Sequence, residues 1–185
     1  MRLHVALTNR RSDITDPERR SRGQLCLEAL RYASAHAACD CVLDYLLHVR
    51  CNPCNLLFSD GVYAFCIHYD GHRARTETLY AGLHLLGDTD INDPEHPRIK
   101  RARQAFENLP RQIPDLLDGL TSLMAEHSTG KGGVCQHGTH GGTRSSAIIL
   151  LEQHTVNSGH FYYAEGPPCS TRYIDLSHKL RQTIR

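Results

Sequence analysis

The apolar residues at the start of the chain alternate with other residues, which is the pattern of a β-strand. Leu3, Val5 and Leu7 follow this period, and a polar, turn-rich stretch comes after Asn9, so we expect a strand from the first residues to about Asn9. Over residues 21–50 the apolar positions instead recur every three or four residues. This spacing places them on one face of a helix, and the length of the segment favours two consecutive helices.

A group of short β-compatible runs follows. They lie at residues 56–58, 62–69 and 73–80. Asp60-Gly61 separates the first two runs, and Asp70-Gly71 precedes the last one. An Asp-Gly pair supplies the positive φ that a type I′ hairpin turn requires. The sequence therefore predicts an antiparallel meander with tight turns.

The second half of the chain predicts a long loop, two helices and a closing pair of strands. Residues 82–97 are rich in Gly, Asp, Asn and Pro, which is typical of a loop. Pro97 and Pro114 stand where two amphipathic helices would begin, and residues 143–152 and 160–165 predict strands. Grouped helices and neighbouring strands favour an α+β fold, with antiparallel sheets packed on helices, over a parallel α/β sheet.

The composition is that of an ordinary globular protein. The 185 residues include 40% apolar and 22% charged residues, with a net charge of +1. These values predict one folded domain and offer no strongly basic surface for nucleic acid. No apolar run is long enough to span a bilayer, and the first residues lack the apolar stretch of a secretory signal. We therefore expect a cytoplasmic protein without a membrane span.

The eight cysteines raise the question of disulfides and metal sites. Disulfides are rare in reducing compartments, and a chain of this length does not need them. Cys51 and Cys54 have the spacing of half a zinc site or of a redox pair, with Cys39 and Cys41 upstream. However, residues two apart on a helix point to different sides, and Cys54 leads into a strand. We predict buried, inert thiols here, with zinc binding as the alternative.

Further donor side chains lie close together in the glycine-rich segment 130–142. Cys135, His137 and His140 combine a thiolate with imidazoles, which suits zinc, copper or haem iron. The alternative is a flexible loop whose donors face water. The sequence shows no fourth ligand beside these three residues, and this favours the alternative.

Hydroxyl groups and an arginine stand just before the apolar run 147–151. Thr143, Arg144 and Ser145 follow a pair of glycines. Arg144 could hold a carboxylate or phosphate through two parallel hydrogen bonds, with Thr143 and Ser145 as short donors. A strand edge with an exposed arginine fits the same spacing, so both interpretations stay open.

Several short blocks, taken together and in their order, resemble the NRDE family, also described as the Transport and Golgi organisation protein 2 family. The blocks are Ala6-Leu7-Thr8-Asn9-Arg10, Ser21-Arg22-Gly23, Asn52-Pro53 with Asn55-Leu56-Leu57, Gly82-Leu83-His84, Gly142-Thr143-Arg144-Ser145-Ser146 and Gly166-Pro167-Pro168. The similarity runs from about residue 4 to about residue 175. It implies a single NRDE-like domain over residues 1–185.

The resemblance implies a fold like that of the N-terminal-nucleophile hydrolases, an αββα sandwich of antiparallel sheets between helix layers. The family carries a cysteine directly after the initiator methionine and then Asn-Arg-Asp-Glu, whereas this chain has Arg2 at that position. We therefore expect the C-terminal larger part of the family domain, N-terminally incomplete. In that mechanism the freed α-amino group activates the nucleophile, so we do not expect hydrolysis from this form.

The leading functional interpretation is binding of a small molecule, or a role in trafficking, with haem or a lipid-linked metabolite as the ligand class that the resemblance implies. An N-terminal-nucleophile amide (C–N) hydrolase whose nucleophile segment is missing is the alternative, and a zinc-binding interaction module is the second. By its position in the family pattern, Arg144 would stabilise an anion, and Asn9 would be a polar residue that lines the site. Gly87-Asp88 stands where the family usually has Ser-Asn. The ligand-binding residues predicted in this way are Asn9, Arg10, Asn55, His84, Asp88, Thr143, Arg144 and Ser145.

Overall fold

The computed structural model describes residues 3–127, 132–139, 141–151 and 159–182. The chain divides into two compact units, Met1–Ile99 and Lys100–Arg185. The boundary falls near the start of helix α3 (Pro97–Glu107). The single domain that the sequence predicts stays a prediction.

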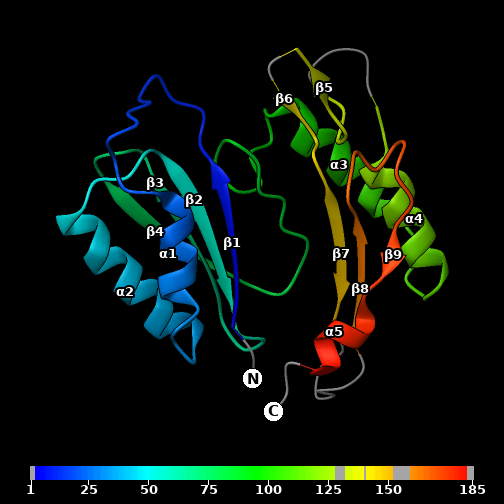
Figure 1. Ribbon diagram of the computed structural model, residues 1–185, viewed down its shortest axis with the longest axis horizontal. Helices are drawn as coiled ribbons and strands as arrows, with labels where there is room; N and C mark the ends of the chain where they lie inside the picture. Colours follow the sequence, from blue (N-terminus) through cyan, green and yellow to red (C-terminus); the bar gives the residue numbers. More distant parts are fainter. Residues whose placement is uncertain (1–2, 128–131, 140, 152–158, 183–185) are drawn as a thin grey trace. The chain divides into compact units, whose positions relative to one another are not determined.

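The first unit is an antiparallel sheet with helices on one face (Figure 1). Its strands, in the sheet order β1-β2-β3-β4, are His4–Asn9, Cys54–Ser59, Ala64–Tyr69 and Ala74–Leu79. Helices α1 (Arg22–Ala29) and α2 (Ala35–His48) contact this sheet. The expected first strand, the two consecutive helices and the three-strand meander are therefore confirmed.

Both faces of this sheet carry packed apolar side chains, since successive strand residues point to opposite sides and each face meets a different part of the unit. Leu56, Phe58 and Ile67 face the helices and pack with residues such as Val42 in the main core. On the other face, a smaller cluster joins Cys66 and Leu79 of the sheet to Leu86 and Ile91 of the loop after β4. The predicted loop at residues 82–97 is thus ordered against the sheet.

The turns of the meander differ from the prediction. Four residues, not two, separate Ser59 from its partner Ala64, and only Gly61 of the Asp60-Gly61 pair has a positive φ, of 87°. The type I′ prediction is wrong because the Asp60 carboxylate closes the loop instead. Its Oδ1 accepts hydrogen bonds from the backbone N–H groups of Val62 and Tyr63, each at 2.9 Å. Such side-chain-to-backbone bonding is an alternative to a tight backbone turn.

The second unit combines helices with short antiparallel strands. Its elements after α3 are α4 (Asp115–Met124), β5 (His137–Gly138), β6 (Gly141–Gly142), β7 (Ser146–Leu150), β8 (His160–Ala164), β9 (Ile174–Asp175) and α5 (Ser177–Gln182). Strands β7, β8 and β9 form one antiparallel sheet, and β5 and β6 form a separate hairpin. The predicted helices and the β7–β8 pair are confirmed, whereas β5, β6, β9 and α5 were not predicted.

The described residues therefore form a mixed α+β protein with antiparallel sheets, as the element order predicted. No helix in the described ranges has the length and apolar character needed to cross a membrane.

Candidate functional site

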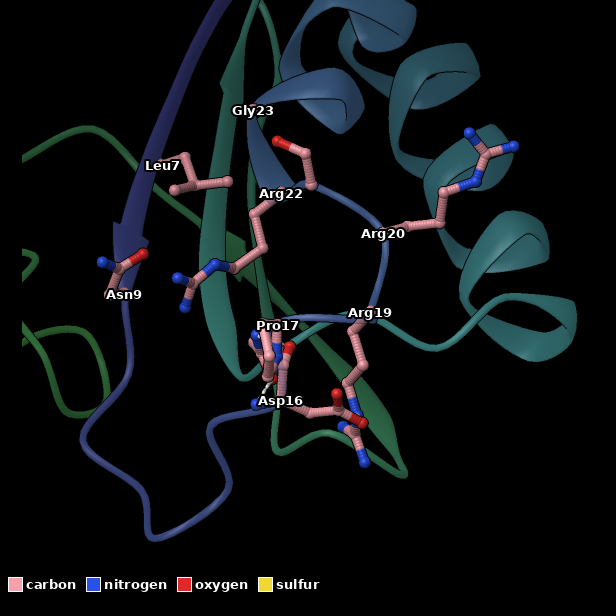
Figure 2. Close-up of a pocket in the computed structure, with 10 residues that line it drawn as sticks. Leu7, Asn9, Asp16, Pro17, Arg19, Arg20, Arg22 and Gly23 are labelled. Carbon is pink, nitrogen blue, oxygen red and sulfur yellow. Dashed lines mark hydrogen bonds and ion pairs between the residues drawn. The ribbon is translucent and has the colours of Figure 1, made fainter.

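An open pocket lies where β1 ends and α1 begins in the first unit (Figure 2). Its volume is about 270 Å³. Its lining comes from segments far apart in the sequence and consists of Leu7, Asn9, Asp16, Pro17, Arg19, Arg20, Ser21, Arg22, Gly23 and Asn52. Three of the sequence blocks on which the predicted family resemblance rests thus meet at one pocket, since each contributes at least one of these residues.

The start of α1 gives the pocket a positive end. Ser21 precedes the helix in an extended conformation, and its side chain makes no capping hydrogen bond. The first N–H groups of a helix have no partner within the helix, and they favour a nearby negative charge. The first turn of α1 carries no acidic side chain. An anionic ligand would therefore find backbone donors at Arg22 and Gly23.

The arginines of the pocket have different orientations. Arg22 is half-buried, donates from Nη1 to the carbonyl oxygen of Pro53 at 3.0 Å, and lies toward Asn9 in Figure 2. Arg19 is held by the carbonyl oxygens of Cys51 and Gly71, at 3.0 and 3.2 Å from its Nη1. A guanidinium carries several N–H donors, so Arg22 can bind a ligand while it keeps its bond to Pro53.

Arg20 and Asp16 complete the electrostatics of the pocket. The Arg20 side chain points away from Asn9 and Arg22 in Figure 2. The carboxylate of Asp16 lies 3.6 Å from Nε of Arg19 and so partly neutralises the positive charge of that arginine. Asn52 fixes the Asp16 backbone, because its Oδ1 accepts from the N–H at 3.0 Å and its Nδ2 donates to the C=O at 2.8 Å. The arginine best placed for a ligand is therefore Arg22.

Arg10 and Asn55, predicted as ligand-binding residues, meet on the sheet face opposite the helices. Nη1 of Arg10 donates to Asn55 Oδ1 at 2.7 Å and to Asp90 Oδ1 at 2.6 Å. His68 Nδ1 lies 2.8 Å from the same Asn55 oxygen. Burial alone would raise the pKa of Asp90, but hydrogen bonding and charge from Arg10, with Arg75 nearby, hold that pKa below its ordinary value. This network holds the loop after β4 on the sheet, while Asn9 alone of these predicted residues lines the pocket.

Asp88 and His84 also belong to this loop. Asp88 accepts from Nη2 of Arg11 at 3.0 Å, and its other carboxylate oxygen lies 2.8 Å from Nε2 of His96. Nδ1 of His84 lies 3.1 Å from Nδ2 of Asn92, and its Nε2 lies 2.7 Å from the carbonyl oxygen of Tyr80. Both side chains have partners within the loop, and their predicted role in ligand binding stays a prediction.

Thr143, Arg144 and Ser145 lie in the second unit, just before β7. The Thr143 N–H donates to the carbonyl oxygen of Gln136 at 2.8 Å, and its Oγ1 accepts from the Gln136 N–H at 3.0 Å. Arg144 and Ser145 are exposed. Thr143 thus closes the β5–β6 hairpin, whereas Arg144 is open to solvent, and a role as an anion clamp stays a prediction.

A cluster of thiols and imidazoles lies at the same hairpin. Cys135 Sγ is 3.7 Å from His137 Nε2, which in turn is 3.2 Å from Cys169 Sγ. One ligand atom each of His127, Cys135, His137 and Cys169 lies within 4.8 Å of all the others. Two of the three metal candidates from the sequence are therefore neighbours, and His140 lies outside the described residues. The sequence reasoning missed His127 and Cys169, which are distant in the chain.

Cys51 and Cys54 are completely buried in the first unit. Burial raises the pKa of both thiols, that of Cys54 to about 12. Without a metal ion, thiols of this kind stay protonated at neutral pH, and the protonated thiol is a poor nucleophile. The prediction that these thiols are buried is confirmed, and their inertness stays a prediction.

Comparison of the chain with models of known protein families and with curated proteins found no match.

Proposed function

We propose that this chain is a small-molecule-binding protein of the NRDE type whose ligand presents a phosphate or carboxylate to Arg22. The proposal rests on the observation that residues from three separate sequence blocks line the same pocket. The pocket offers a guanidinium, the Asn9 amide and the N-terminus of α1. Helix N-termini and arginines both favour anions, so binding is the function that this chemistry supports best.

The ligand classes that the resemblance implies share this chemistry. Haem carries two propionate groups, and a lipid-linked metabolite with a phosphate carries the same kind of charge. The proposal also includes the αββα sandwich, which the resemblance implies, and a cytoplasmic location, which is expected from the sequence. The amide-hydrolase alternative stays a prediction from the same resemblance.

Titration of the full chain with haemin, followed by its Soret band, and with geranyl diphosphate, followed by calorimetry, tests the proposal and separates the two ligand sources. We expect saturable binding of at least one of these probes. Arg22→Ala should weaken it by about 10- to 100-fold, because a hydrogen-bonded charge contributes about 1.5–3 kcal/mol. Arg22→Lys should recover part of the loss, since lysine keeps the charge without the planar donor array.

Arg31→Ala is the matched control, because Arg31 is an exposed arginine beyond the other end of α1 and does not line the pocket. We expect its affinity to change by less than about twofold. Equal affinity of wild type and Arg22→Ala would exclude the pocket as the binding site. A haemin signal abolished by His137→Ala but kept by Arg22→Ala would place haem in the second unit and would also contradict the proposal.

A further inference from the structure

Two cysteines and two histidines converge in the second unit from three separate segments. His127 follows α4, Cys135 and His137 lie at the start of the β5–β6 hairpin, and Cys169 lies in the connection after β8. We propose that these four side chains bind one zinc ion. The proposal is independent of the pocket beside Arg22, since none of its residues lines that pocket.

The distances within the cluster fit a tetrahedral zinc ion. Zinc binds thiolate sulfur at about 2.3 Å and imidazole nitrogen at about 2.0–2.1 Å, so neighbouring ligand atoms of a tetrahedron lie about 3.3–3.8 Å apart. The separations that His137 Nε2 makes with the sulfur atoms of Cys135 and Cys169 are 3.7 and 3.2 Å. All four ligand atoms lie within 4.8 Å of one another. Closure around an ion therefore needs shifts of about 1 Å or less.

The donor types favour zinc over other ions. Two thiolates and two imidazoles form the Cys₂His₂ set of structural zinc sites, whereas calcium and magnesium require oxygen ligands. Four protein ligands fill the tetrahedral shell and leave no position for water or substrate. The site is accordingly structural, and we do not assign catalysis to it.

The backbone around the ligands is already fixed. The N–H of Cys135 donates to the carbonyl oxygen of Glu126 at 3.0 Å, which joins the first ligand segment to the second. The β5–β6 pairing brings Gly142 opposite His137. A Cβ at Gly142 would lie 2.6 Å from the carbonyl oxygen of Gln136, so only glycine permits this close approach. Zinc would thus bind to segments that are already close together.

Few apolar side chains are buried in the described part of the second unit. Its buried apolar side chains in the described ranges are Cys135, Ile148, Ala164 and Pro168. None of the residues of α4 is fully buried, although several are leucines. A metal ion adds to the stability of a small unit that has few buried apolar side chains. A zinc ion would join the end of α4, the hairpin and the segment after β8.

Elemental analysis of zinc in the full chain tests the inference. The chain is purified with a thiol reductant and dialysed before the measurement. We expect about one zinc ion per chain in the wild type, as for other Cys₂His₂ sites. Cys169→Ser and His127→Ala replace exposed residues, so both variants should fold. Each should bind zinc at least about 10- to 100-fold more weakly in competition with a chelator, because loss of a ligand costs no less than loss of a hydrogen-bonding partner of a ligand. Cys41→Ser, in α2 and outside the cluster, is the control and should keep the wild-type affinity.

Replacement of zinc by cobalt gives an independent signature of the ligand set. The wild type should show a sulfur-to-cobalt charge-transfer band, and Cys169→Ser should lose about half of its intensity because one of two thiolates is gone. Failure of the reduced wild type to take up zinc or cobalt would overturn the inference. Unchanged zinc affinity of Cys169→Ser would also overturn it, as would iron with inorganic sulfide in place of zinc.

Discussion

The guanidinium of Arg10 donates a hydrogen bond to the side-chain oxygen of Asn55 at 2.7 Å, and Asn55 is completely buried. The amide nitrogen of Asn55 donates in turn to the carbonyl oxygens of Thr89 at 2.8 Å and Gly87 at 3.3 Å. One buried amide therefore holds the chain after β1 and the loop after β4 together. A buried polar group that loses its partner costs far more than an exposed one.

Asn55→Ala should lower the free energy of unfolding by about 3 kcal/mol, because the carbonyl oxygens of Gly87 and Thr89 lose their donor and Arg10 loses one of its acceptors. Urea denaturation followed by circular dichroism measures this change. Thr78→Ala, at an exposed position of β4, is the control and should cost less than about 1 kcal/mol. Equal losses for the two variants would show that the network contributes little to stability.

His68 makes the stability of the first unit depend on pH. Burial, followed by the nearby charge of Arg75, lowers the pKa of His68, and this outweighs the opposite effect of Asp90 and Glu77. The unfolded chain, in which the imidazole titrates near about pH 6.5, binds the proton more readily than the folded chain. This contribution to stability is therefore complete above about pH 6.5 and is lost as the pH falls toward the folded pKa.

His68→Gln should remove this component. The free energy of unfolding of the wild type should fall more steeply between about pH 7.5 and about pH 5.5 than that of the variant. His72→Gln replaces an exposed histidine of the β3–β4 turn and should keep the wild-type slope. The assignment of the pH dependence to His68 fails if wild type and His68→Gln show the same slope in urea unfolding.

The elements predicted correctly are those in which apolar residues recur with the period of a strand or of a helix. Leu3, Val5 and Leu7 indicated β1 because they pack on the core that the helices cover. Strands β5, β6 and β9 have two residues each, and a period cannot be recognised over such a length. Strands β5 and β6 form through hydrogen bonds to each other, and β9 forms through hydrogen bonds to β8.

The candidate sites were predictable only in part, because they depend on contacts between distant segments. Asn9 was predicted as a ligand-binding residue, but Arg22 was not, although Ser21-Arg22-Gly23 is one of the blocks on which the predicted family resemblance rests. The position of this block at the start of the predicted helical segment, residues 21–50, could have indicated an anion site. His127 and Cys169 have no local motif, and only the folded chain brings them to Cys135 and His137.

The two Asp-Gly pairs of the meander allow a matched comparison between a buried and an exposed carboxylate that accept hydrogen bonds from loop N–H groups. Asp60 and Asp70 each accept hydrogen bonds from two backbone N–H groups of their own loop. Asp60 is buried and also accepts from the N–H of Ala35, at the start of α2, at 2.9 Å. Burial would raise the pKa of Asp60, but backbone hydrogen bonds from Tyr63, Ala35 and Val62 hold it below its ordinary value.

We expect Asp60→Ala to cost about 2–3 kcal/mol of unfolding free energy at neutral pH, because the buried N–H of Ala35 and the N–H groups of Val62 and Tyr63 lose a charged acceptor. Asp70→Ala should cost less, since water can replace the carboxylate at that exposed loop. Because the folded pKa of Asp60 is lowered, its contribution is present above the unfolded pKa of about 3.9 and is lost as the pH falls through the folded value. The difference between the two variants should therefore shrink in acid. Urea denaturation at about pH 7 and about pH 3 measures it, and a difference of the same size at both values would contradict the assignment to the ionised carboxylate.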